Sequence, residues 1–239
     1  MITINNNMYV LDTDNTSYVF AVLGSGQLEH LYYGRKLHAN EAVMTEKHTF
    51  IPGNTNVYNK DYSSYSLEDV CLEMSSLGKG DIREPFIEVT YPNGSSTTDM
   101  VFDRAEIIKG KEEYDTLPGS YDDNGDVEQL VIYLKDRNYN LTLELHYYVY
   151  EKCDIITRSA KLVNSGNESV RLERLMSMQL DLNESDYELS FFNGAWAREM
   201  NRSRIPLRAG KYVNESVTGT SSNRSNPFYM IGRSSTTED

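Results

Sequence analysis

The side chains best suited to metal or nucleophilic chemistry are few and widely spaced in this sequence. Four histidines occur, at His30, His38, His48 and His146. They show no H-E-x-x-H arrangement or other metal-ligand spacing. The two cysteines, Cys71 and Cys153, lack the spacing of a zinc site or a redox pair, and we interpret them as buried thiols. We therefore predict no metal site and no cofactor.

Paired carboxylates, which glycoside hydrolysis needs about 5–10 Å apart, occur only in polar loops. The pairs are Asp12/Asp14, Glu112/Glu113 and Asp122/Asp123. No apolar neighbours are present to raise the pKa of one member above that of the other, as an acid–base pair requires. We interpret them as charged loop residues and predict no catalytic residue in this chain.

One stretch departs from the pattern of the rest. It contains the only tryptophan, Trp196, followed by arginines Arg198, Arg202, Arg204 and Arg208. Indole and guanidinium groups suit both sugar recognition and ion-pair networks at an interface. Residue types alone favour a plainer interpretation, a core tryptophan beside a salt-bridged surface ribbon.

The elements that would position these side chains are strands. Alternation with a period of two is clearest from Leu141 to Val149, where leucine, tyrosine and valine share one face. We predict further strands over 18–23, 27–33, 86–91, 127–135, 155–163 and 170–182. We predict that the strands over 141–149, 155–163 and 170–182 form a meander. Helical spacing is confined to 66–74, where we predict one short helix.

These many short strands predict an all-β fold of stacked antiparallel sheets, a sandwich or double sandwich. No linker or repeat divides the chain, so we expect one domain over 1–239. Its net charge of −13 argues against nucleic-acid binding. We find no apolar run long enough to span a bilayer and no signal peptide, and we expect a cytoplasmic protein.

Five segments in order closely resemble the N-terminal domain of glycoside hydrolase family 36, the bacterial α-galactosidases. They are LGKGDIREP (77–85), YEKCDIITRS (150–159), RLERLMS (171–177), GAWARE (194–199) and GTSS (219–222) with NPF (226–228). The resemblance implies an antiparallel β-supersandwich, with stacked sheets like those of galactose mutarotase, that precedes a (β/α)₈ barrel. Within the segment 77–85, we expect Arg83 to pair with a carboxylate and to fix a loop.

The resemblance also implies that the catalytic aspartates of a retaining enzyme lie beyond Asp239. We thus expect these 239 residues to lack hydrolytic activity. The parent would be a homotetrameric α-galactosidase that releases terminal α-galactose from melibiose, raffinose or similar oligosaccharides.

In tetrameric relatives the N-terminal domain reaches over a neighbouring subunit's pocket, and the tryptophan of the G-A-W motif meets the sugar. By motif that residue is Trp196, with Arg198 positioning it or donating hydrogen bonds. A second contact falls near Glu46, where relatives often place an aspartate.

Two alternatives remain open. One is a free-standing carbohydrate-binding module, for which Tyr147, Tyr148 and Tyr150 are candidate aromatics. The other is a structural sandwich without a ligand.

Overall fold

The computed structural model describes residues 1–38, 56–182, 186–221 and 223–236. They form two compact units, Met1–Asp181 and Leu182–Asp239. The only helix in the described ranges is the 3₁₀ turn η2, Glu151–Cys153. The predicted all-β fold with very little helix is therefore confirmed, whereas the single domain over 1–239 stays a prediction.

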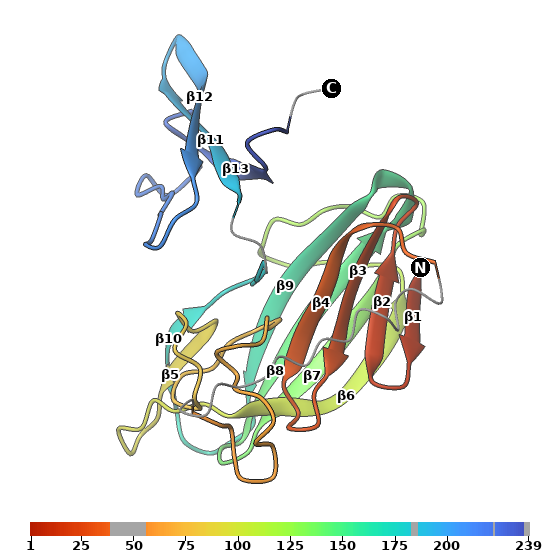
Figure 1. Cartoon of the computed structure of the whole chain (residues 1–239), viewed down its shortest axis with the longest axis vertical. Helices are drawn as coiled ribbons and strands as arrows, with labels where there is room; N and C mark the ends of the chain where they lie inside the picture. The colour runs from red at the N-terminus through yellow and green to blue at the C-terminus, as the bar shows by residue number, and fades with distance from the viewer. Residues whose placement is uncertain (39–55, 183–185, 222, 237–239) are drawn as a thin grey trace. The chain divides into compact units, whose positions relative to one another are not determined.

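The first unit contains two antiparallel four-stranded sheets, ordered β1-β2-β3-β4 and β6-β7-β8-β9. The first sheet consists of β1 (Ile2–Asn5), β2 (Met8–Asp12), β3 (Thr16–Val22) and β4 (Leu28–Arg35). The second consists of β6 (Met100–Lys109), β7 (Glu128–Asp136), β8 (Leu141–Tyr150) and β9 (Ile155–Asn164). Figure 1 shows the two sheets stacked on one another. The strands predicted over 18–23, 27–33, 127–135, 141–149 and 155–163 are thus confirmed.

The core of the first unit lies between these two sheets. Alternate residues of each strand point into it, among them Phe20 of β3 and Tyr147 of β8, which are both fully buried. Tyr9, Phe20 and Tyr147 stack in sequence, with ring centroids 5.0 and 5.2 Å apart. Burying a side chain of this size contributes about 1.5–3 kcal/mol, so these rings help to hold the sheets together.

A small third sheet joins β5 (Ile87–Thr90) to β10 (Arg171–Leu175). The predicted strand over 170–182 is therefore only partly correct. The predicted meander is wrong at its third strand, because β8 pairs with β9 but β10 pairs with β5. The alternating pattern gave the faces of the strand but contained no information about its partner.

The helix predicted over 66–74 is absent, and the segment forms turns and a bridge instead. Its backbone bonds to β4: the His30 N–H donates to the Cys71 carbonyl, and the Glu73 N–H donates to the Leu28 carbonyl. Leu67, Val70 and Leu72 still pack together in a small core of their own. Tertiary hydrogen bonds have thus replaced the helical ones, while the apolar spacing serves packing.

The second unit is a three-stranded sheet of order β12-β11-β13. Its strands are β11 (Glu188–Ala195), β12 (Arg198–Pro206) and β13 (Ser225–Gly232). Among the described residues from 186 to 236, only Leu189 is buried. This sheet therefore has almost no interior of its own.

Two further expectations concern single features of the chain. Neither cysteine forms a disulfide in the described residues, and Cys71 is only half-buried while Cys153 is exposed in η2, so the interpretation as two buried thiols is wrong. Across the described ranges, no helix has the length and apolarity needed to cross a membrane.

Candidate functional site

Trp196 and Arg198 lie at the tip of the β11–β12 hairpin. The two strands pair antiparallel from Glu188 opposite Pro206 to Ala195 opposite Arg198, so only Trp196 and Ala197 connect them. Two-residue connections of this kind need a left-handed backbone. Ala197 supplies it, with φ 58°, at a cost of about 1–2 kcal/mol for a residue with a side chain. Other contacts must hold this turn in place.

Two side chains brace the turn. The Glu199 Oε1 atom accepts a hydrogen bond from the Ala197 N–H at 2.9 Å, and the Asn201 Nδ2 donates to the Arg198 carbonyl at 2.7 Å. Backbone N–H groups of Glu199 and Ala197 lower the pKa of the Glu199 carboxyl group. At neutral pH Glu199 is therefore an ionised acceptor that fixes the conformation beneath the indole.

Gly194 allows the two strands to approach one another at the base of the turn. A Cβ atom at this position would lie 2.3 Å from the Arg198 carbonyl oxygen and 2.9 Å from the Glu199 Cα. Because both are backbone atoms, no side-chain rearrangement would relieve the clash. The glycine of the G-A-W motif is thus a steric requirement of this hairpin.

The indole of Trp196 is displayed to solvent. Its residue is 88% exposed, which overturns the interpretation as a core tryptophan. Arg198 is also exposed, and no described residue pairs with its guanidinium group. A large aromatic face on a braced turn is suited to stacking against an apolar surface, and the free guanidinium group beside it can donate hydrogen bonds. The third predicted site residue, Glu46, lies outside the described residues.

The first unit holds a buried ionic cluster that the sequence reasoning missed. Glu73 is fully buried and lies 3.2 Å from Arg158, measured between Oε2 and Nη1. His30 contacts Glu73 through Nδ1 at 2.8 Å, and the Tyr18 and Tyr147 hydroxyls each donate to its carboxylate at 2.7 Å. The cluster ties β3, β4, β8 and β9 to the segment 72–74.

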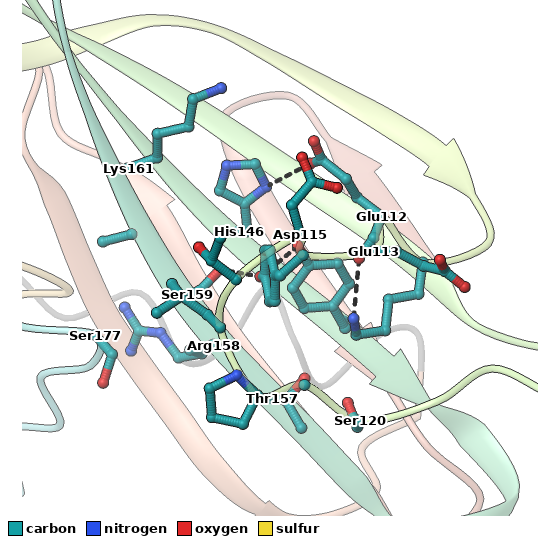
Figure 2. Close-up of a pocket in the computed structure, with 18 of the residues that line it drawn as sticks. Glu112, Glu113, Asp115, Ser120, His146, Thr157, Arg158, Ser159, Lys161 and Ser177 are labelled. Atoms are coloured by element: carbon teal, nitrogen blue, oxygen red, sulfur yellow. Dashed lines mark hydrogen bonds and ion pairs between the residues drawn. The ribbon is translucent and has the colours of Figure 1, made fainter.

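A groove runs along the edge strand β9, beneath residues 110–120, which we call the strap, and residues from both faces of β9 line it (Figure 2). Tyr114 fastens the strap, because its hydroxyl lies 2.8 Å from the Tyr148 hydroxyl and 2.6 Å from the Ser159 Oγ. The Ser120 Oγ and the Tyr150 hydroxyl, 2.5 Å apart, fasten its far end. The cavity beneath measures about 1000 Å³.

Of the aromatics considered for a free-standing carbohydrate-binding module, Tyr147 is unavailable because it lies in the core. Tyr148 is also buried and supports the strap. The predicted ion pair of Arg83 is confirmed, since its Nε lies 2.9 Å from Asp81 Oδ1 and its Nη1 also contacts Asp181. In the described residues no group of three or more His, Cys, Asp or Glu side chains could hold a metal ion.

Stacked antiparallel sheets with a braced, tryptophan-bearing hairpin define a β-sandwich domain with an exposed aromatic contact. The chain belongs to glycosyl hydrolase family 36 as its N-terminal domain, since residues 26–239 match that family domain.

Its relatives are α-galactosidases. The chain is 35% identical over 227 residues to α-galactosidase AgaA of Geobacillus stearothermophilus, covering 92% of this chain and 30% of the relative. It is 33% identical over 235 residues to the bifunctional α-galactosidase/sucrose kinase AgaSK of Mediterraneibacter gnavus, covering 98% of this chain and 25% of the relative. The chain thus spans about 30% or less of the length of these proteins.

Solved structures agree with this assignment. The crystal structure of the family 36 α-galactosidase AgaB from Geobacillus stearothermophilus superposes with a TM-score of 0.91 at 31% identity, over 98% of this chain and 32% of that one. A variant of AgaA from the same organism, crystallised in complex with raffinose, superposes with a TM-score of 0.88 at 32% identity, over 95% and 32%.

Trp196 and Arg198 stay predicted site residues, and a motif rather than their chemistry pointed to them. Trp196 is exposed because it lies in a two-residue turn. In the sequence, Gly194 is the only indication of that turn. The buried cluster had one available signal, since Arg158 occupies an inward position of the β9 alternation. A buried arginine at such a position requires a buried anion.

Proposed function

We propose that this chain is the N-terminal domain of a retaining α-galactosidase and that it has no hydrolytic activity by itself. The bond-breaking carboxylates would lie in the part of the parent polypeptide outside residues 1–239. This proposal is supported by the family membership. The parent would be a cytoplasmic homotetramer acting on terminal α-galactosyl groups of melibiose- or raffinose-type oligosaccharides.

The domain's own contribution would be a sugar contact in a neighbouring subunit's pocket. The observation that carries this proposal is the 88% exposed indole of Trp196 on a turn held by Glu199 and Asn201. One face of a pyranose is lined with C–H groups and packs against such a ring, while the exposed guanidinium group of Arg198 donates to hydroxyls at the rim.

The test uses the full-length parent enzyme with Trp196→Ala. Taking the indole–pyranose contact to be worth as much as a pair of aromatic rings, about 0.5–1.5 kcal/mol, we expect KM for raffinose to rise about 2- to 12-fold. Trp196→Phe should restore part of the affinity. Met200→Ala is the matched control, because Met200 is exposed on the same hairpin and should leave KM unchanged. An unchanged KM in Trp196→Ala would refute the sugar contact.

Whether the indole acts in a neighbouring subunit needs mixed oligomers. One kind of subunit carries Trp196→Ala and an intact catalytic part. The other kind keeps Trp196 but has an inactivated catalytic part, and the two kinds are combined in one oligomer. If the indole serves its neighbour, the mixture should show active sites with the wild-type KM. If every active site keeps the raised KM, the indole acts only within its own subunit. Separately, turnover of an α-galactoside by the 239-residue chain would contradict the proposed lack of activity.

A further inference from the structure

The groove beneath the strap plays no part in the proposed function. Its apolar surface comes from Leu117 and Pro118 of the strap and from Leu172 and Leu175 of β10. Leu117 and Leu172 are 67% and 45% exposed. Its volume of about 1000 Å³ lies at the upper end of the range found for small-molecule sites. The groove thus offers an apolar surface within a cavity of small-molecule size.

Polar groups without protein partners face the same cavity. The hydroxyls of Thr157 and Ser177 and the carboxylates of Glu113 and Asp115 line it, and none of them bonds to another described side chain. Figure 2 shows Ser177 with Arg158 on one side of the view and Glu112 and Glu113 on the other. Hydroxyl and carboxylate groups arranged around an apolar surface can bind a ligand that carries hydroxyls of its own.

An adjoining cavity of about 470 Å³ adds planar polar groups. Gln129 is 1% exposed there, and its Nε2 donates to His146 Nδ1 at 2.9 Å. His146 Nε2 in turn donates to the Glu144 carboxylate at 3.3 Å. The Gln129 Oε1 has no protein hydrogen-bond partner, although buried amide oxygens normally have one. That oxygen is itself inaccessible to solvent, so a ligand at this end of the groove would meet the His146 and Glu144 side chains instead.

The charges of the groove do not favour an ion of either sign. Glu112, Glu113 and Asp115 contribute negative charge, while Lys111, Lys161 and Arg158 contribute positive charge, with Arg158 paired to the buried Glu73. Burial lowers the pKa of His146, despite the opposing effect of Glu144, so its ring is neutral at pH 7. A neutral ligand with many hydroxyls fits this balance better than a phosphate or a metal ion.

We propose that the groove beneath the strap binds a neutral oligosaccharide, through a set of residues that does not include Trp196. The apolar surface would pack against the C–H faces of the sugar rings, and the unpartnered hydroxyls and carboxylates would bind its hydroxyls. The choice of an α-galactoside as the probe rests on the proposed function, whereas the site itself does not.

The test is a titration of the 239-residue chain with raffinose, followed by NMR chemical shifts and by calorimetry. We expect saturable binding with a Kd of about 1–10 mM, which corresponds to about −4 to −3 kcal/mol. The shifted resonances should be those of the strap, β8 and β9. Thr157→Arg should weaken binding at least about tenfold, because the side chain enters the groove.

Thr142→Arg is the matched control. Thr142 is on the same face of the same sheet but does not line the groove, so the variant should bind raffinose like the wild type. Trp196→Ala should also bind normally, which separates this site from the hairpin contact measured by KM. The proposal is overturned if raffinose at about 50 mM shifts no groove resonance. It is equally overturned if Thr157→Arg and Thr142→Arg bind alike, since binding would then lie elsewhere.

Discussion

Replacing Arg158 with methionine should strongly destabilise the first unit. The arginine side chain is 4% exposed and that of Glu73 is fully buried, so the substitution leaves a carboxylate without its cation inside the core. Removing one partner of a buried ion pair costs about 3–5 kcal/mol. The loss also deprives the Gln179 carbonyl of a donor at 2.8 Å. The free energy of unfolding, measured by urea denaturation at pH 7, should fall by that amount.

A matched control and a double variant separate the buried charge from the loss of arginine as such. Arg171 pairs with Glu173 on the surface, and its side chain is 76% exposed. Arg171→Met should therefore cost no more than about 1 kcal/mol. In Arg158→Met/Glu73→Leu the unpaired charge is gone, so the double variant should be less destabilised than the sum of the single ones. The reasoning is refuted if Arg158→Met costs no more than Arg171→Met.

The pH dependence of stability tests the same cluster. Burial pushes the pKa of Glu73 upward, but the charge of Arg158 and the hydrogen bond from His30 outweigh it, so the folded-state pKa lies below the usual 4.5. A lowered pKa contributes stability that is complete above the unfolded-state value and is lost as pH falls through the folded-state value. Without the charge of Arg158, the pKa of Glu73 in the folded variant should lie above its value in the folded wild type. The stability gap between wild type and Arg158→Met should thus narrow toward acidic pH, as measured by urea titrations at several pH values.

Two further substitutions test local geometry. Gly194→Ala should open the β11–β12 hairpin, because the new methyl group meets the backbone of Arg198 and Glu199; amide hydrogen exchange in β11 and β12 should accelerate, and unchanged exchange would show that the strands can separate without loss. Asp136→Ala should lower the free energy of unfolding by about 1–3 kcal/mol, because its carboxylate accepts the Asp99 N–H at 2.9 Å and the Asn138 N–H at 2.8 Å. A loss below about 0.5 kcal/mol by urea denaturation would show that those amides find other acceptors.

The sequence predicted strands well where one face is buried and poorly where long-range pairing decides. β7, β8 and β9 follow from alternation because each has a clear inward set of apolar residues. The segment 66–74 has helical spacing, but its amides bond to β4 and to Asp181, which no local pattern reveals. Likewise β10 pairs with β5, which lies more than eighty residues earlier in the chain.

The sequence likewise predicted one part of the candidate sites and missed the other. Trp196 was predicted as a site residue because a family motif includes it, whereas the residue types around it alone favoured a buried tryptophan. The groove could not be predicted, because its walls come from the strap, β8, β9 and β10, and these meet only in the folded chain. Glu112 and Glu113, interpreted as ordinary loop charges, turn out to line it. Both residues are exposed, as expected of loop charges, and both also line the cavity beneath the strap.

The near absence of an interior in the sheet β12-β11-β13 bears on how this chain would melt. With Leu189 as its only buried residue among those described, that unit has little apolar surface to return to water on heating. It therefore contributes little enthalpy or heat capacity to a calorimetric trace, which would report mainly on Met1–Asp181. A single melting temperature would therefore measure the unfolding of the sandwich and would not measure the unfolding of the tryptophan hairpin.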